Sequence, residues 1–287
     1  MKDSLSPPLR LLRRFNRSVE FNGIRGALAH SYRRLFRSLK NHGVTGTFER
    51  AFVKAPEAPP AVFESRPHPF DVLHGTETCR PISVNALAWQ SFSAVFVNGY
   101  LGIAPSTFRP ALAALPIQHE EFSFIDIGCG KGRALFIAAE LPFRQLIGVE
   151  LSGELCEVAR SNVARNAVWT DRISIVNQDA TNFIYPEGPL VLFFYYPFYA
   201  AVLRRVLKNL ERQLRRSPRP AYLLYADYDY RADDESATAP HQKVLSSCAF
   251  LQKVSESAYS LSPEDAAAEP SSCTANRFSL HLADVTR

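Results

Sequence analysis

The chain has 287 residues, of which 46% are hydrophobic, 11% aromatic and 21% charged. This apolar content excludes disorder of the chain as a whole, and the longest apolar run, residues 190–203, is too short to cross a bilayer and is interrupted by Pro197. The net charge of +5 is unevenly placed, because residues 1–54 hold 12 Lys and Arg against 3 Asp and Glu, whereas the remainder is mildly acidic.

Residues 1–54 are predicted to form a basic amphipathic helical arm. Five apolar residues recur at helical spacing, and four basic residues fall on the other faces. These are Leu28, Tyr32, Leu35, Phe36 and Leu39, and Arg33, Arg34, Arg37 and Lys40. Such a helix can lie on an anionic membrane surface or dock on the acidic remainder of the chain. No apolar core of a secretory signal precedes it, whereas an organelle transit peptide stays open.

Residues 55–121 are predicted to be a linker followed by a helical cap that packs on the core. Proline punctuates residues 55–69, which indicates a linker or a surface loop. Residues 87–96 have a helical pattern. Ser106 is predicted to be the N-cap of a helix that runs to Leu115, in which Pro110 is tolerable only near the first turn.

Residues 122–287 are predicted to be the catalytic core, because strand and helix patterns alternate there. Strands are expected at 122–127, 145–149, 173–177, 190–195 and 221–226, and helices at 133–141, 153–166 and 200–216. Apolar strands separated by helices predict an α/β fold with a Rossmann-like, doubly wound and mostly parallel sheet. Residues 250–254 and 278–283 suit an antiparallel strand pair at the edge of that sheet.

The turn after the first predicted strand is the most informative segment. It reads D-x-G-x-G-x-G from Asp126 through Gly128, Gly130 and Gly132. Glycines let the backbone approach a ligand closely, and the following helix N-terminus supplies free N–H groups. Arg133 stands where the dinucleotide fingerprint GxGxxG needs its third glycine, which disfavours a nicotinamide oxidoreductase. An acid at 126 suits a cation, such as an ammonium beside a sulfonium.

Two further acids follow neighbouring strands. Glu150 ends the second predicted strand, where a carboxylate can accept both hydroxyls of a ribose, and Asp179 closes the third. Because ligands of open α/β sheets bind outside the carboxyl ends of the strands, the three acids predict one binding crevice.

This pattern resembles motif I of class I S-adenosylmethionine-dependent methyltransferases. The stretches G-V-E-L-S at 148–152 and Y-P-F at 196–198 are similar to a bacterial subgroup with a basic N-terminal arm, distantly like protein lysine methyltransferases. The resemblance implies S-adenosyl-L-methionine as cofactor, with Asp179 facing the adenine and with Tyr100 and Ser106 closing over the methionine part. The cofactor-binding residues that it implies are Tyr100, Asp126, Gly128, Cys129, Gly130, Gly132, Glu150, Leu151, Asp179, Ala180 and Tyr196.

Tyr196 departs from the subgroup, which has an asparagine before Pro-Phe. In related N-methyltransferases the polar side chain at this position orients the acceptor nitrogen, so Tyr196 either orients through its hydroxyl or signals a changed substrate or lost activity. Tyr196 and Asp227, which follow the fourth and fifth strands, are the candidate catalytic residues. Aromatic faces can hold an amine cation, and a carboxylate can complement its charge or take a proton. Core burial is expected for Tyr195, Tyr222 and Tyr225.

The remaining lysine, arginine, cysteine and histidine residues near the turn or along the chain are predicted to have structural rather than chemical roles. Lys131 and Arg133 are expected at the solvent edge of the turn, and Cys129 as a small filler within it. The five cysteines include no CxxC pair, so neither a disulfide framework nor a zinc site is predicted, and a reducing compartment fits best. The seven histidines lack the spacing of metal ligands, and no metal site is expected.

The predicted function is methyl transfer to a nitrogen acceptor, with a protein side chain favoured and a small molecule second. A nucleic-acid methyltransferase is disfavoured because the basic charge is confined to the arm. A non-catalytic cofactor-binding or interaction protein is a further alternative, motivated by Tyr196. The expected location is the cytoplasm, with the arm contacting a membrane surface; the acceptor and the oligomeric state stay open.

Overall fold

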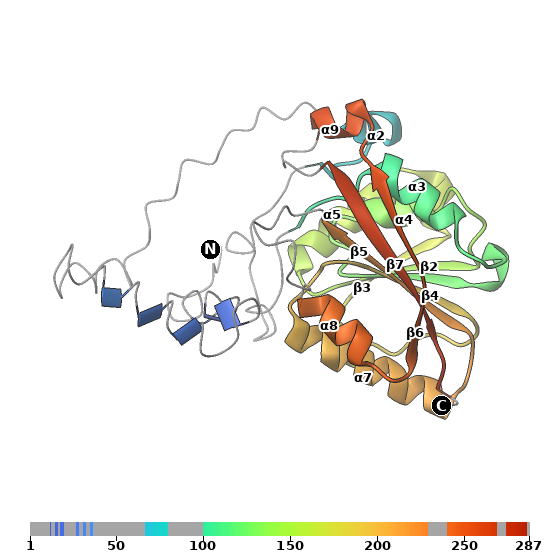
Figure 1. The fold of residues 1–287 in the computed structure, drawn as a ribbon. Coiled ribbons are helices and arrows are strands. Elements are labelled where there is room, and N and C mark those ends of the chain that lie inside the picture. Colours follow the sequence, from blue (N-terminus) through green and yellow to red (C-terminus); the bar gives the residue numbers. More distant parts are fainter. Residues whose placement is uncertain are drawn as a thin grey trace.

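The computed structural model describes residues 67–79, 100–228, 240–268 and 274–285, with isolated positions between 12 and 36. Seven strands form one sheet in the order β3-β2-β1-β4-β5-β7-β6 (Figure 1). Their bounds are β1 Ser123–Ile127, β2 Gln145–Glu150, β3 Ile173–Asn177, β4 Leu190–Tyr195, β5 Ala221–Tyr228, β6 Leu251–Ser260 and β7 Ala275–Ala283. The pairs from β3 to β5 are parallel, whereas β7 runs antiparallel to both β5 and β6. The predicted α/β class and its antiparallel C-terminal pair are confirmed.

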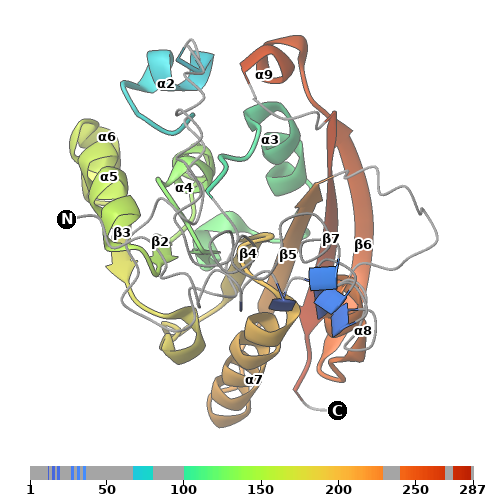
Figure 2. The same cartoon turned by 90° about the vertical axis from the view of Figure 1, so that its left-hand side faces the viewer.

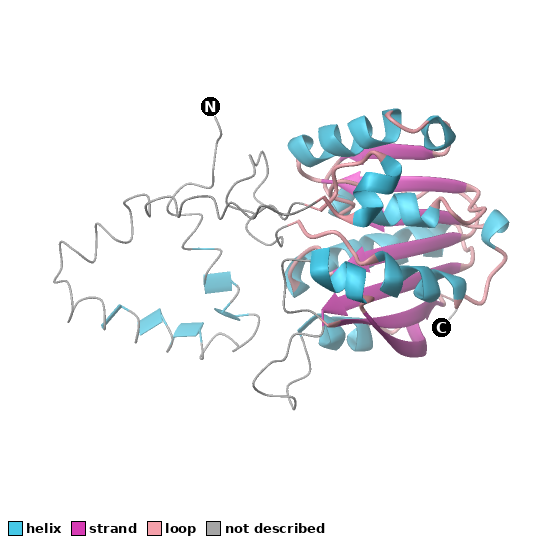
Figure 3. Cartoon of the chain, turned by 90° about the horizontal axis from the view of Figure 1, so that it is seen from above, coloured by secondary structure: helices cyan, strands magenta, loops and turns pink. Residues whose placement is uncertain are grey.

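Helices cover both faces of the sheet, as wholly apolar strands require (Figures 2 and 3). Alternate residues of β1 and β4 face opposite layers. Phe124 and Phe193 pack toward one layer, and Ile125 and Phe194 toward the other. The first layer holds α3 Pro105–Ala113, α4 Arg133–Ala138, α5 Gly153–Ala164 and α6 Ala167–Thr170, and the second holds α7 Ala200–Arg216 and α8 Pro240–Ser247.

Several predicted bounds need correction, most of all those of α3. The helix begins at Pro105, so Ser106 lies inside its first turn and Ala104 occupies the N-cap position. The cap comes from elsewhere, because the Ser106 amide donates to Asp265 Oδ2 at 2.8 Å. Asp265 belongs to α9 Pro263–Ala268, which lies between the two strands of the antiparallel C-terminal pair. Pro110 stands in the middle of α3 rather than in its first turn.

A helix that the sequence did not predict, α2 Pro69–His74, lies beside α9 (Figure 2). The His68 side chain accepts from the Phe70 amide at 3.1 Å, and His68 Nε2 lies 3.3 Å from Asp265 Oδ1. Phe70 itself is buried against the first helical layer. The segment before the glycine turn therefore packs on the core, while the predicted boundaries at 54 and 121 stay predictions. The helix predicted at 87–96 lies outside the described residues.

The basic arm is described only at scattered positions. Leu28, Tyr32, Leu35 and Phe36 are helical, as predicted, and are exposed by 56%, 68%, 52% and 61%. Leu39 and the rest of the predicted helix lie outside the described positions. Among the helices that the structure describes, none has both the length and the apolarity needed to span a membrane.

Candidate functional site

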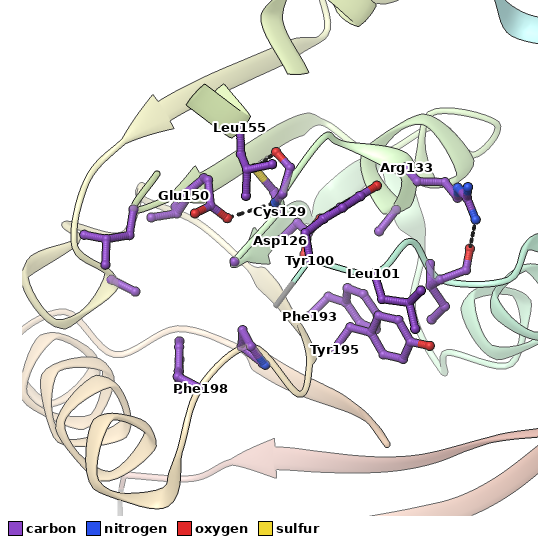
Figure 4. A pocket seen from close by; sticks show the side chains of 18 of the residues that line it. Tyr100, Leu101, Asp126, Cys129, Arg133, Glu150, Leu155, Phe193, Tyr195 and Phe198 are labelled. Carbon is purple, nitrogen blue, oxygen red and sulfur yellow. Dashed lines mark hydrogen bonds between the residues drawn. The ribbon is translucent and has the colours of Figure 1, made fainter. Parts of the chain in front are cut away.

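A cavity lies at the carboxyl ends of β1, β2 and β4, and it encloses about 920 Å³ of empty space including the solvent at its mouth (Figure 4). This volume suits a ligand of drug or cofactor size. Nine of the predicted cofactor residues contribute to its wall. They are Tyr100, Asp126, Gly128, Cys129, Gly130, Glu150, Leu151, Asp179 and Ala180. Gly132, Tyr196 and Ser106 are not among the residues that line it.

The glycine turn contributes Gly128 and Gly130 to the wall of the cavity, and only glycine fits at these two positions. Gly128 and Gly130 have φ of 83° and 54°, in the left-handed region. A Cβ on Gly128 would stand 2.5 Å from Pro197 Cβ, and one on Gly130 would stand 2.2 Å from Tyr100 Cδ2. Tyr100, whose hydroxyl donates to the Thr78 carbonyl at 2.7 Å, therefore lies directly against the turn.

Glu150 is held in place by the backbone around it. Its two carboxylate oxygens accept from the amides of Gly130 at 3.0 Å and Ser152 at 2.8 Å, which ties the end of β2 to the glycine turn (Figure 4). Burial raises the pKa of Glu150, and the backbone hydrogen bonds offset only part of that rise. The carboxylate thus has a fixed orientation toward the cavity.

Asp126 is the second buried acid of the site. It is 3% exposed and, among the described residues, its carboxyl group makes no hydrogen bond. Burial, and then the charge of Glu150, raise the pKa of Asp126 well above its usual range. A positively charged ligand group beside Asp126 would relieve both effects, so the site fits a cation next to a hydroxyl-bearing group.

Asp179 has a structural role besides its place in the cavity wall. Its Oδ1 accepts from the Thr181 amide at 2.9 Å and from the Thr181 hydroxyl at 2.7 Å, which caps a short 3₁₀ helix, η4 Ala180–Asn182. These bonds fix the carboxylate at the end of β3. Its predicted contact with adenine stays a prediction.

Lys131 and Arg133 do not lie at the solvent edge of the turn, so that prediction is wrong. They are 1% and 2% exposed, because the segment before the turn folds over them. Lys131 Nζ pairs with Glu77 and lies 5.2 Å from the centre of the Tyr100 ring. Arg133 Nε donates to the Thr78 hydroxyl at 2.7 Å. Both cations therefore hold residues 76–79 and 100 on the turn.

Neither candidate catalytic residue lines the cavity, but the structure brings both together through His241. The Tyr196 ring meets the His241 ring edge-on at 5.0 Å, and His241 Nε2 lies 2.6 Å from Asp227 Oδ2. The sequence does not predict a role for His241 at this site, because His241 is far from Tyr196 along the chain and lacks the spacing of metal ligands. Tyr195, expected in the core, is half-buried and lines the cavity, whereas Tyr225 is buried as predicted.

Cys129 packs as a small side chain beneath the turn, where it is 5% exposed and in contact with Gly148. Burial, and then the charges of Asp126 and Glu150, raise its pKa well above the usual value, which disfavours the reactive thiolate. In the described part of the chain, no three His, Cys, Asp or Glu side chains are grouped to hold a metal ion.

Comparison with known proteins finds one family and a set of distant structures. Residues 124–217 match the model of the family described as methyltransferase domain. No curated protein matches the chain. Similar solved structures include the "StiE O-MT" fragment of residues 942–1257, with 18% identity over 61% of this chain and 72% of that chain and a TM-score of 0.42. A SAM-dependent methyltransferase from Leishmania major is 14% identical over 60% and 69%, with a TM-score of 0.45. Another from Aquifex aeolicus is 11% identical over 62% and 91%, with a TM-score of 0.44.

Proposed function

Since the chain carries a class I S-adenosylmethionine-dependent methyltransferase domain, we propose that the protein transfers the methyl group to a nitrogen acceptor, with a protein side chain favoured over a small molecule. When bound, the cofactor supplies an electrophilic methyl group on a sulfonium. The acceptor class, unlike the cofactor, is our inference from the surroundings of the cavity.

The observation that carries the cofactor assignment at atomic level is the buried Asp126 carboxyl group, to which no described residue donates a hydrogen bond. A cationic amino-acid end placed there would restore its ionised form. Glu150, already oriented by two amides, would accept the ribose hydroxyls, and Tyr100 would wall the opposite side. These residues bind and orient the cofactor and exclude water from it.

A nitrogen acceptor is supported by what surrounds the cavity. Its described lining includes no histidine or lysine that could deprotonate a reluctant oxygen acceptor. Tyr195 at the end of β4 and Phe198 after it supply aromatic walls. Asp227 lies near the end of β5 with its side chain 22% exposed. An uncharged amine needs alignment and desolvation more than a strong base, and aromatic faces stabilise the cation formed on methylation. The proton released afterwards can pass to solvent or to a carboxylate.

The test is methyl transfer from S-adenosylmethionine labelled in its methyl group to a lysate of the source cells. Label in a protease-sensitive, nuclease-resistant fraction, recovered on hydrolysis as a methylated amino acid with an N-methyl group, is the expected result. Label on oxygen would overturn the nitrogen assignment, and label on a small molecule would replace the favoured acceptor by the second one. Asp126→Asn serves as the negative control. No transfer to any fraction would favour a non-catalytic cofactor-binding protein.

For the arm, we propose attachment to an anionic membrane surface. Leu28, Tyr32, Leu35 and Phe36 form an exposed apolar row on helical residues, within a segment that holds 12 basic and 3 acidic residues. Apolar burial and attraction to anionic lipids act together in such a helix. Phe36→Glu is expected to reduce co-sedimentation with phosphatidylserine-containing vesicles, while Val72→Glu, at an exposed apolar residue of α2, leaves it unchanged. Equal or absent binding to anionic and neutral vesicles would contradict the proposal.

A further inference from the structure

Tyr196 has an unusual backbone conformation for its residue type. It directly follows β4 and has φ of 42°, and among the described residues no other non-glycine residue has a positive φ. An aromatic residue in the left-handed region is strained, and such strain persists only where the surroundings impose it. The side chains that hold Tyr196 therefore identify what imposes this conformation.

His241, the second residue of α8, is a side chain in contact with the Tyr196 ring. The two rings meet at 67° with their centres 5.0 Å apart, and the His241 ring also stacks on Tyr225 at 4.9 Å and 11°. His241 is 2% exposed, and its Nε2 lies 2.6 Å from Asp227 Oδ2. The imidazole is thus packed against two tyrosine rings and lies in close contact with a carboxylate.

The conformation of Tyr196 decides where the next two residues go. Pro197 and Phe198 both line the cofactor cavity, whereas Tyr196 itself does not. Pro197 lies so close to the glycine turn that a Cβ on Gly128 would stand 2.5 Å from the Pro197 Cβ. If Tyr196 relaxed to an ordinary extended conformation, the chain would leave β4 in another direction and this wall would move away from the turn.

We propose that His241, which lies against Asp227, is a positioning residue for the cofactor cavity. Its ring holds Tyr196 in the left-handed conformation, and Tyr196 in turn places Pro197 and Phe198 against the glycine turn. The inference concerns the cofactor cavity alone, and it does not depend on the acceptor proposed above. It makes a buried histidine on α8, outside the cavity, a determinant of cofactor affinity.

The test is a double-mutant cycle read by the Kd for S-adenosylhomocysteine, measured calorimetrically on the full chain. His241→Ala is expected to weaken binding about tenfold, because a left-handed non-glycine residue loses its support. Tyr196→Gly removes the strain, since glycine adopts this φ freely, and is expected to leave the Kd within about threefold. Adding His241→Ala to Tyr196→Gly should then have little further effect, which is the rescue that a merely structural histidine would not show.

The matched control is His281→Ala, at a histidine of β7 that is 4% exposed and 3.1 Å from the Ser279 hydroxyl. It should lower the melting temperature without changing the Kd. The proposal is overturned if His241→Ala lowers the melting temperature but leaves the Kd unchanged, or if Tyr196→Gly does not rescue it. Should His241→Ala alone not fold, the double variant is the decisive one: folded with near-native Kd supports the proposal, and unfolded overturns it, because His241 would then be a general core residue.

Discussion

Replacing Glu150 by Gln is expected to change cofactor binding in two separable ways. The carboxylate accepts from the amides of Gly130 and Ser152 and would accept from the ribose of the cofactor. It also lies close enough to Asp126 for its charge to raise the pKa of that acid, second to the effect of burial. The substitution keeps the size and shape of the side chain but removes the charge and one acceptor.

The first effect is a lower affinity at neutral pH. Hydrogen bonds to charged groups contribute about 1.5–3 kcal/mol, and Gln keeps one of the two acceptor oxygens. We therefore expect a loss of about 2 kcal/mol, which corresponds to a Kd for S-adenosylhomocysteine about 30-fold weaker. Glu140→Gln is the control, because Glu140 pairs with Arg109 on the surface, with their side chains 36% and 45% exposed, and should change the Kd little.

The second effect is a shift in the pH dependence. On the proposed placement of the cofactor, its cationic end needs Asp126 in the ionised form, so affinity should fall as the pH falls through the raised pKa of Asp126. Without the charge of Glu150 that pKa is lower, and the fall should begin at a lower pH than in the native protein. Calorimetric titrations across the acidic range give both quantities. A weaker Kd whose pH dependence does not move would refute the coupling between the two carboxylates.

Three further substitutions, the first with a matched control, test the packing around the site by thermal and urea unfolding. Gly130→Ala is expected to lower the free energy of unfolding by about 1–3 kcal/mol, because the φ of Gly130 is 54° and Tyr100 fills the space that a Cβ would need. Gly153→Ala is the control and should be neutral or stabilising, because Gly153 is in a helix and its added Cβ would lie 3.7 Å from the nearest atom, Asn177 Oδ1. Arg133→Met should cost about 2–4 kcal/mol, since it removes a buried charged donor, and an unchanged melting temperature would contradict its assigned role. Asp265→Ala should cost about 1–2 kcal/mol at neutral pH through loss of the cap on α3. Burial raises the pKa of Asp265, but hydrogen bonds from His68 and Ser106 lower it by more. The difference in free energy of unfolding between the native protein and Asp265→Ala should therefore be complete above pH about 4 and shrink as the pH falls below that value.

Regular elements with a strong apolar pattern could be predicted from the sequence closely. The bounds of β3, β4 and α7 agree with the residue ranges expected. For β4 and α7 the reason is that a continuous apolar strand and an apolar helix stripe leave little choice of structure. The short helices α2, α6 and α9 carry too few residues for a periodic signal. The start of α3 depends on Asp265, which lies 159 residues further along the chain, and local capping rules cannot anticipate such a partner.

The candidate site, like the fold, could be predicted only in part. The gathering of Asp126, Glu150 and Asp179 around one cavity could be predicted, because the carboxyl ends of adjacent parallel strands must meet. The surroundings of Tyr196 could not, because His241 reaches it from a helix beyond β5, and nothing in the local sequence marks either the contact or the positive φ.

The burial of Lys131 and Arg133 changes how the glycine turn functions in this protein. The acids of the turn and strand ends face the cavity, and Arg133 contributes to its wall. Lys131 and Arg133 hold the preceding segment through Glu77 and Thr78. Arg133 also lowers the pKa of Asp71, although burial opposes this and the hydrogen bonds from Thr76 and Thr78 contribute more. Since Asp71 accepts from Thr78, and Thr78 accepts from both Tyr100 and Arg133, the wall over the turn depends on the same residues as the turn itself. Disturbing either one should therefore impair the other, which makes the segment before the turn part of the cofactor site rather than a passive cover.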